Sequence, residues 1–281
     1  MPEMDEPQFR QWQQLLESRT GMTLPPERRS FLQANLGIRM REIGCESYQE
    51  YFEKVASGGG AIVEWATLVD RLTVQETRFF RDPDAFSLVS DYVLTRPREE
   101  LLADPLEVWS VGCSTGEEVY TLAMQIQECM EHLGLTKTYF GVTGTDISQP
   151  ALDKAKRGLY GPRKLVSTDE RLKEKYFIGR ENNLLEIVPA LRERVCFARL
   201  NVLELQKAPM HGMNIIFCQN LLIYFRRWRR REIVNHLAER LAPGGILILG
   251  QGELTDWHHP ELQRVPSDYV LAWIRRPTDD E

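Results

Sequence analysis

Apolar residues recur at helical spacing through the first quarter of the chain, and this pattern predicts three short helices between Phe9 and Gly60. A fourth helical pattern runs from about Ala61 to Leu72. Pro25 and Pro26 suit a helix start, and Ser47 can cap the third helix. The apolar positions of the first three helices are Phe9, Trp12, Leu15, Leu16, Phe31, Leu32, Leu36, Met40, Tyr48, Tyr51, Phe52 and Val55. We therefore expect residues 1–72 to form a small N-terminal helical domain.

Short apolar runs alternate with helical patterns in the rest of the chain, residues 73–281. Strands are predicted at 108–111, 139–147, 195–201, 213–220 and 246–250, with closing β-structure at 265–275. Helices are predicted at 85–94, after residue 117, at 149–157, and from the arginine run at 226–231 to Leu241. This alternation predicts an α/β fold with a mainly parallel sheet. Asn182-Asn183 between two apolar runs predicts a hairpin in a small inserted β-subdomain at about 160–195.

The segment from Val108 to Glu118 predicts a strand, a tight turn with glycine at both ends, and a helix. Such a turn lets the backbone approach a ligand closely, next to the free N–H groups of a helix N-terminus. A dinucleotide fingerprint is disfavoured because Ser114 replaces its second glycine. A nucleophile elbow would use Ser114 with His258 or His259 as base, but no strands are predicted before Val108. The third interpretation is the first strand and loop of an S-adenosylmethionine-dependent methyltransferase.

Polar residues follow several predicted strands, where ligands bind in doubly wound sheets. Asp146 ends the second strand and could accept two ribose hydroxyls, although it could instead cap the helix 149–157. Asn201 and Asn220 end two later strands. The two prolines typical of amino-group methyltransferases that act on nucleic acids do not follow Asn220.

Composition narrows the class of protein. The chain has 281 residues and a formal net charge of -6, which argues against sequence-independent nucleic-acid binding by the whole chain. No apolar run is long enough to span a bilayer, and the N-terminus is acidic, so we expect a cytoplasmic protein without membrane insertion. Five scattered cysteines without a C-x-x-C pair indicate buried thiols rather than disulfides or a metal site.

Basic residues gather in two places, and a single further arginine stands beside an aromatic pair. Arg28, Arg29, Arg39 and Arg41 lie on the second predicted helix, either as a solvated surface or as a docking surface for an acidic partner helix. Arg81 follows Phe79-Phe80 just before the sheet and is well placed to hold a carboxylate. The arginine run at 226–231 opposes the dipole of its helix, so it could face an anion.

Four motifs together resemble the CheR family, bacterial enzymes that methylate glutamates on chemotaxis receptors. They are Thr77-Arg78-Phe79-Phe80-Arg81, Ser114-Thr115-Gly116-Glu117-Glu118, Thr145-Asp146-Ile147, and the segment from Phe217 to Phe225. The resemblance covers nearly the whole chain in order and spacing. It implies a class I, Rossmann-like S-adenosylmethionine-dependent methyltransferase sheet, with an N-terminal helical domain and an inserted β-subdomain.

The resemblance also implies the roles of individual residues. Contacts to S-adenosylmethionine, or to its product S-adenosylhomocysteine, are implied for Gln75, Thr77, Arg81, Gly112, Glu118, Asp146, Asn201, Val202, Gln219 and Asn220. Arg81 and Tyr224 would be catalytic, with Tyr224 beside the transferred methyl group. Arg39 and Arg41 would face the cytoplasmic domain of a methyl-accepting receptor. Separately from the resemblance, we expect a monomer, although no motif reports the oligomeric state.

Three departures from the family pattern concern the donor site. Gln75, Gln219 and Val119 replace a usual asparagine, arginine and proline, respectively. The alternative function is therefore a module that binds S-adenosylmethionine without turnover. The segment 178–194 is short, which favours an enzyme that needs no peptide tether on the receptor.

The expected chemistry needs no general base, because a glutamate with a pKa near 4.3 is ionised at neutral pH. In this interpretation Arg81 and Tyr224 steer the acceptor carboxylate, while Asp146 and Glu118 fix the adenosyl group.

Overall fold

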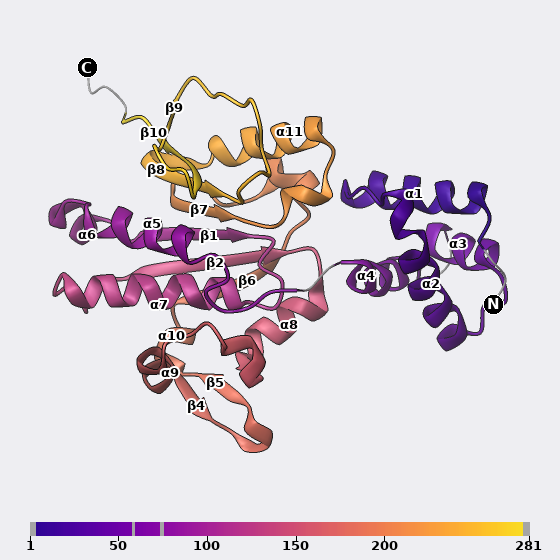
Figure 1. The fold of residues 1–281 in the computed structure, drawn as a ribbon, viewed down its shortest axis with the longest axis horizontal. Coiled ribbons are helices and arrows are strands. Elements are labelled where there is room, and N and C mark those ends of the chain that lie inside the picture. Colours follow the sequence, from indigo (N-terminus) through magenta and orange to yellow (C-terminus); the bar gives the residue numbers. More distant parts are fainter. Residues whose placement is uncertain (1–3, 58–59, 74–75, 278–281) are drawn as a thin grey trace.

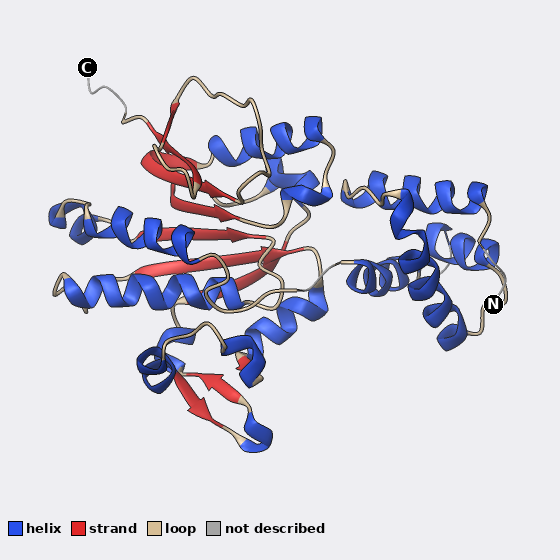
Figure 2. Ribbon diagram, in the orientation of Figure 1, coloured by secondary structure: helices blue, strands red, loops and turns tan. Residues whose placement is uncertain are grey.

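The computed structural model describes residues 4–57, 60–73 and 76–277, which form a helical domain and a larger α/β domain (Figure 1). The helical domain stands beyond the carboxyl edge of the main sheet, as the strand arrows in Figure 2 show. Gln75 lies outside the described residues, so the structure leaves its expected contact untested. Among the described residues, no helix is long and apolar enough to cross a membrane.

The N-terminal domain consists of the four expected helices, α1 (Glu6–Thr20), α2 (Arg29–Ile43), α3 (Tyr48–Ser57) and α4 (Ala61–Leu72). The first helix begins earlier than predicted because the Asp5 carboxylate accepts the Gln8 N–H at 2.7 Å as its N-cap. The Ser47 hydroxyl accepts the Glu50 N–H at 3.2 Å, as the sequence predicts. The apolar faces meet in a core around Trp12, Leu36 and Tyr51.

The main sheet has seven strands in the order β6-β2-β1-β7-β8-β10-β9. The strands are β1 (Leu106–Val111), β2 (Phe140–Asp146), β6 (Val195–Arg199), β7 (Met213–Cys218), β8 (Leu241–Leu249), β9 (Leu262–Arg264) and β10 (Leu271–Arg275). The first five strands in this order are parallel, and β10 and β9 are antiparallel to their neighbours. This arrangement confirms the predicted fold class.

Helices cover both faces of the sheet (Figure 1). One face packs against α5 (Pro83–Leu94), α6 (Arg98–Ala103), α7 (Glu117–His132) and α8 (Gln149–Arg157). The other face packs against α11 (Arg227–Ala238). Because side chains alternate along a strand, Val108 joins the first core and Trp109 the second. The indole N–H of the fully buried Trp109 donates to the Thr145 hydroxyl at 2.9 Å, which ties β1 to β2.

The predicted inserted β-subdomain is a three-stranded antiparallel sheet, in the order β3-β5-β4. Its elements are β3 (Leu159–Tyr160), α9 (Glu170–Tyr176), β4 (Phe177–Gly179), β5 (Leu185–Ile187) and α10 (Pro189–Arg192). Asn182 and Asn183 both have φ 58°, the left-handed conformation that a tight hairpin turn requires.

The predicted turn before the strand at 246–250 needs correction. The helix before β8 ends at Ala238, and Pro243-Gly244-Gly245 lies inside β8 as a bulge instead of forming a turn before it. A Cβ on Gly245 would come within 2.7 Å of the Met213 carbonyl oxygen, so this bulge requires glycine.

The prediction that the cysteines are buried also needs correction. Four cysteines are buried as expected, but Cys196 on the edge strand β6 is exposed.

The helical domain is joined directly to the segment that follows β7. The Thr23 N–H donates to the Tyr224 carbonyl oxygen at 2.8 Å, and Met22 forms an antiparallel bridge with Phe225. An ion pair between Glu17 and Arg226, with Nη2 2.9 Å from the carboxylate, extends this contact. Thus one residue of the arginine run pairs with an acid of the neighbouring domain.

Candidate active site

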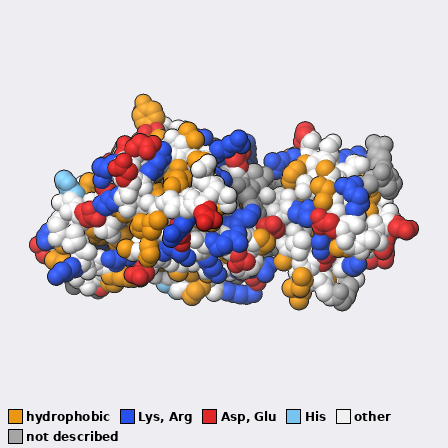
Figure 3. Space-filling model, turned by 90° about the horizontal axis from the view of Figure 1, so that it is seen from below, with side chains coloured by type: hydrophobic (Ala, Val, Ile, Leu, Met, Phe, Trp, Pro, Cys, Tyr) orange, Lys and Arg blue, Asp and Glu red, His pale blue; other side chains and the backbone are white. Residues whose placement is uncertain are grey.

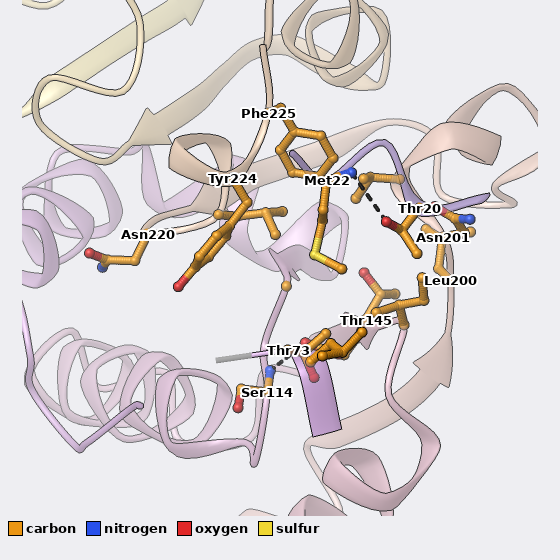
Figure 4. A pocket seen from close by; sticks show the side chains of 16 residues that line it. Thr20, Met22, Thr73, Ser114, Thr145, Leu200, Asn201, Asn220, Tyr224 and Phe225 are labelled. Atoms are coloured by element: carbon orange, nitrogen blue, oxygen red, sulfur yellow. Dashed lines mark hydrogen bonds between the residues drawn. The ribbon is translucent and has the colours of Figure 1, made fainter. Parts of the chain in front are cut away.

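Two adjoining cavities lie at the carboxyl ends of β1, β2 and β7, and both are lined by Gly112, Ser114, Asn220 and Tyr224. The first cavity encloses about 730 Å³ that no protein atom fills, part of it open to solvent, and its lining is mainly apolar. The second is more polar and includes Glu118 in its lining. Figure 4 shows the first cavity, with the side chains of Tyr224 and Met22 pointing into it. A ligand with one apolar and one charged end would fit across both.

The turn between β1 and α7 brings backbone to the point where the cavities meet. Gly112 and Gly116 have φ 77° and 92°, which side chains other than glycine rarely adopt. A Cβ on Gly112 would lie 3.0 Å from the Leu221 side chain, and one on Gly116 would lie 2.6 Å from the Ala155 Cβ. The Gly112 N–H donates to the Thr145 carbonyl oxygen at 2.8 Å. The glycines therefore permit a turn that places Ser114 at the cavity wall.

Asp146 ends β2 and lines the apolar cavity. Its Oδ2 accepts the Ser114 N–H at 2.8 Å, and its Oδ1 accepts the Ser148 N–H at 2.9 Å. Helix α8 is capped by the Ser148 hydroxyl, so Asp146 is not its N-cap. Burial raises the pKa of Asp146, and hydrogen bonds from backbone amides oppose this rise. An ionised carboxylate offers about four acceptor positions, so acceptor capacity remains for a ligand.

Glu118 lies in the first turn of α7. It lines the polar cavity, whereas Asp146 lines the apolar one. Its Oε1 accepts the Ser110 hydroxyl at 2.7 Å. Burial raises the pKa of Glu118 to about 8, while the Ser110 hydrogen bond opposes this rise. Asp146 and Glu118 therefore line different cavities, and the expectation that both fix the adenosyl group stays a prediction.

Arg81 and Tyr224 both line the polar cavity. The Arg81 guanidinium donates to the Glu76 carbonyl oxygen at 2.8 Å, which holds the side chain at the cavity wall. Burial raises the pKa of Tyr224, although the positive charges of Arg28 and Arg81 oppose the shift. A neutral phenol and a cation therefore face the same space.

The other residues named from sequence fall around the same two cavities. Thr77 and Gln219 line the polar cavity, and Asn201 and Val202 line the apolar one. The Asn201 side chain donates to the Arg19 carbonyl oxygen at 2.8 Å and accepts the Leu203 N–H, so it is fixed from both sides. The Asn220 amide donates to Asp82 at 3.1 Å.

Sequence reasoning missed the part of the site that the helical domain supplies. Thr20, Met22 and Leu72 line the apolar cavity, and Figure 4 shows Met22 between Tyr224 and Thr20. The Thr20 hydroxyl accepts the Met22 N–H at 3.1 Å, which fixes the turn after α1. Gly21 has φ 75°, and a Cβ there would lie 2.7 Å from Leu203. The only sequence signal for this part of the site was Gly21, which indicates a sharp turn at the end of the first helix.

The serine-hydrolase interpretation does not fit the geometry. Ser114 has φ 50°, a strained conformation that a nucleophile elbow also uses. However, within the part of the chain that the structure describes, its buried hydroxyl has no hydrogen-bond partner. Neither His258 nor His259 lines the two cavities. A nucleophilic serine needs a base within hydrogen-bonding distance, so we reject this interpretation.

Arg39 and Arg41 lie on α2, outside both cavities. Arg39 makes a two-pronged contact with Glu64 through Nε at 2.8 Å and Nη2 at 2.7 Å, and a further contact with Glu42. These acids raise the pKa of Arg39 and hold its half-buried side chain against α4. Basic and acidic side chains are mixed over the face of the molecule that Figure 3 shows.

Comparison with known proteins gives matches over most of the chain. Residues 75–270 match the family described as CheR methyltransferase, SAM binding domain, and residues 7–73 match CheR methyltransferase, all-alpha domain. Chemotaxis protein methyltransferase 1 of Pseudomonas aeruginosa is 32% identical, over 94% of this chain and 93% of that protein. Chemotaxis protein methyltransferase of Escherichia coli is 30% identical, over 89% of this chain and 85% of that protein.

Proposed function

Since the chain belongs to the CheR methyltransferase family and is an S-adenosylmethionine-dependent methyltransferase of chemotaxis, we propose that it methylates protein glutamates. The substrates would be glutamate side chains on the cytoplasmic domains of chemotaxis-type receptors, and the products glutamate methyl esters. The observation that carries the proposal is the pair of joined cavities, with a cation and a phenol at the polar end.

The residues present fit S-adenosylmethionine. The apolar cavity, with Asp146 at its wall, suits an adenosine whose ribose needs an acceptor for two hydroxyls. The buried Ser114 hydroxyl, without a partner among the described residues, offers a further polar contact. The polar cavity suits the amino acid end, with Glu118 for an ammonium group. When bound, S-adenosylmethionine supplies a sulfonium methyl group that a carboxylate oxygen attacks, leaving S-adenosylhomocysteine.

The protein's own task in this reaction is orientation. Arg81 and Tyr224 would hold the acceptor carboxylate by charge and by a phenolic hydrogen bond, because both face the polar cavity. They are held in different ways: the Arg81 guanidinium donates to the Glu76 carbonyl oxygen, and the Tyr224 backbone carbonyl accepts the Thr23 N–H of the helical domain. Alignment of two reactants can supply roughly 7 to 11 kcal/mol of the barrier without any general base.

The proposal is tested with purified protein, methyl-labelled S-adenosylmethionine and the cytoplasmic domains of candidate receptors. A carboxyl ester releases its label as methanol in alkali, so base-labile label on a receptor would support the proposal. A receptor domain with its candidate glutamates changed to alanine serves as control and should take no label. Binding of the donor without transfer to any tested receptor would favour a binding module, and base-stable label would rule out a glutamate ester.

Glu118 should make donor binding depend on pH. Its pKa of about 8 means that the carboxyl is mostly protonated at pH 7, while pairing with an ammonium group requires the ionised form. Raising the pH from about 6 to about 7.5 should therefore strengthen S-adenosylhomocysteine binding by up to roughly 25-fold, as measured by calorimetry.

The control for this effect is Glu118→Gln, which keeps the shape of the side chain and cannot ionise. Its affinity should be lower at pH 7.5 and nearly constant across the same range. An equally steep pH dependence in this variant would assign the titration to another group.

A further inference from the structure

We propose that Lys164, in the inserted subdomain, is a positioning residue for the donor site. It would hold the segment that carries Thr77 and Arg81, here called the donor loop (residues 76–81), against the start of α7. The inference rests on the proposed donor site and concerns a residue that lies outside both cavities. It would make the inserted subdomain part of the donor-binding machinery.

Lys164 connects two pieces of chain that are far apart in the sequence. Its Nζ donates to the Thr77 carbonyl oxygen at 2.6 Å and lies 3.1 Å from the Glu117 carboxylate. Its own carbonyl oxygen accepts the Phe79 N–H at 3.1 Å. The donor loop is therefore bonded to the subdomain at two places, once by a side chain and once by backbone.

The acid that Lys164 pairs with is fully buried. The Glu117 side chain has 0% exposure, and its other oxygen accepts the Thr115 hydroxyl at 2.6 Å. A buried carboxylate without a counter-charge is costly, so Glu117 holds the lysine ammonium in place. The Lys164 side chain is 37% exposed, which leaves its position dependent on these two contacts.

Further contacts from the same subdomain act on the same two segments. The Tyr160 hydroxyl donates at 2.8 Å to the carbonyl oxygen of Thr115, which lies in the glycine turn between β1 and α7. The Phe79 ring is fully buried and packs edge-on against Tyr160 and Phe177, with ring centroids 4.9 and 5.3 Å apart. These apolar contacts fix the middle of the donor loop. The first residues of the loop are fixed by the bond from Lys164 to the Thr77 carbonyl oxygen.

The test is the affinity for S-adenosylhomocysteine of the full chain and of Lys164→Met, measured by calorimetry. Methionine keeps the length and apolar character of the side chain and removes the ammonium group. We expect the dissociation constant to rise about tenfold, equal to about 1.4 kcal/mol. The KM for S-adenosylmethionine should rise by a similar factor. Lys173→Met, which breaks an ion pair with Glu170 within α9 of the same subdomain, is the matched control and should bind normally.

A second variant separates positioning from simple neutralisation of the buried acid. In the double variant Lys164→Met with Glu117→Gln, the buried charge is gone, so the melting temperature should recover towards that of the unchanged protein. Donor affinity should stay about tenfold weaker, because the bond to the Thr77 carbonyl is still missing. Hydrogen exchange of the amides at 76–81 should be faster in both variants.

Two results would overturn the inference. One is a Lys164→Met protein that binds S-adenosylhomocysteine within twofold of the unchanged chain. The other is a double variant that recovers stability and affinity together, which would reduce Lys164 to a counter-ion. If the unchanged chain itself bound no S-adenosylhomocysteine, the donor site would fail, and this inference with it.

Discussion

Replacing Arg81 with alanine should lower kcat/KM for methyl transfer about 100-fold or more, with little change in the melting temperature. The guanidinium faces the polar cavity beside Tyr224 and is held by the Glu76 carbonyl. A charge-assisted hydrogen bond contributes about 1.5 to 3 kcal/mol, and loss of acceptor alignment adds to it. The measurement is labelled methyl transfer to a receptor domain under single-turnover conditions.

Arg78→Ala is the matched comparison for Arg81→Ala. It removes a positive charge three residues away on the same loop. Both arginines line the polar cavity, but Arg78 is exposed whereas Arg81 is partly buried. We expect a much smaller loss, because water screens an exposed charge. Titration of both variants with S-adenosylhomocysteine separates donor binding from transfer. Full activity of Arg81→Ala would remove this residue from the mechanism.

Changing Asp146 to alanine should weaken S-adenosylhomocysteine binding by about 100-fold in a calorimetric titration. The variant would lack the carboxylate that we propose as acceptor for the ribose hydroxyls, and each such bond is worth about 1.5 to 3 kcal/mol when the acceptor is charged. The Ser114 N–H would also lose its acceptor, so the glycine turn becomes less well fixed. Both losses affect the apolar cavity, which Asp146 lines.

Asp146→Asn is the control for charge alone. An asparagine keeps one acceptor oxygen and nearly the same volume, so its affinity should fall between those of the unchanged protein and the alanine variant. The melting temperatures of both variants show whether the effect is on binding or on folding. Unchanged affinity in Asp146→Ala would mean that the residue only supports the turn.

The sheet and its helices could be predicted because local patterns report them. A buried strand that runs into a glycine turn and an acidic helix start, as at Val108 to Glu118, carries its own signal over eleven residues. The bulge in β8 could not be predicted in this way. Pro243-Gly244-Gly245 has the composition of a turn, and only its pairing with β7 shows that the strand continues through it.

The site was predictable where its residues follow strands, since the carboxyl ends of parallel strands meet at one edge. Asp146, Asn201 and Asn220 line the cavities for this reason. Contacts between distant segments carry no such signal. The pairing of Arg39 with Glu64 joins two helices, and nothing in the helical pattern of α2 reveals it. Met22 reaches the cavity because a segment some 200 residues later pairs with it.

The bridge between Met22 and Phe225 has a consequence for engineered hybrids of this family. A hybrid that takes its helical domain from one relative and its sheet domain from another would combine two halves of the apolar cavity wall from different proteins. Exchanging the segment around Phe225 together with residues 1–72 would keep the wall intact. The natural unit of exchange is therefore discontinuous in the chain, although the two domains look separable in the ribbon.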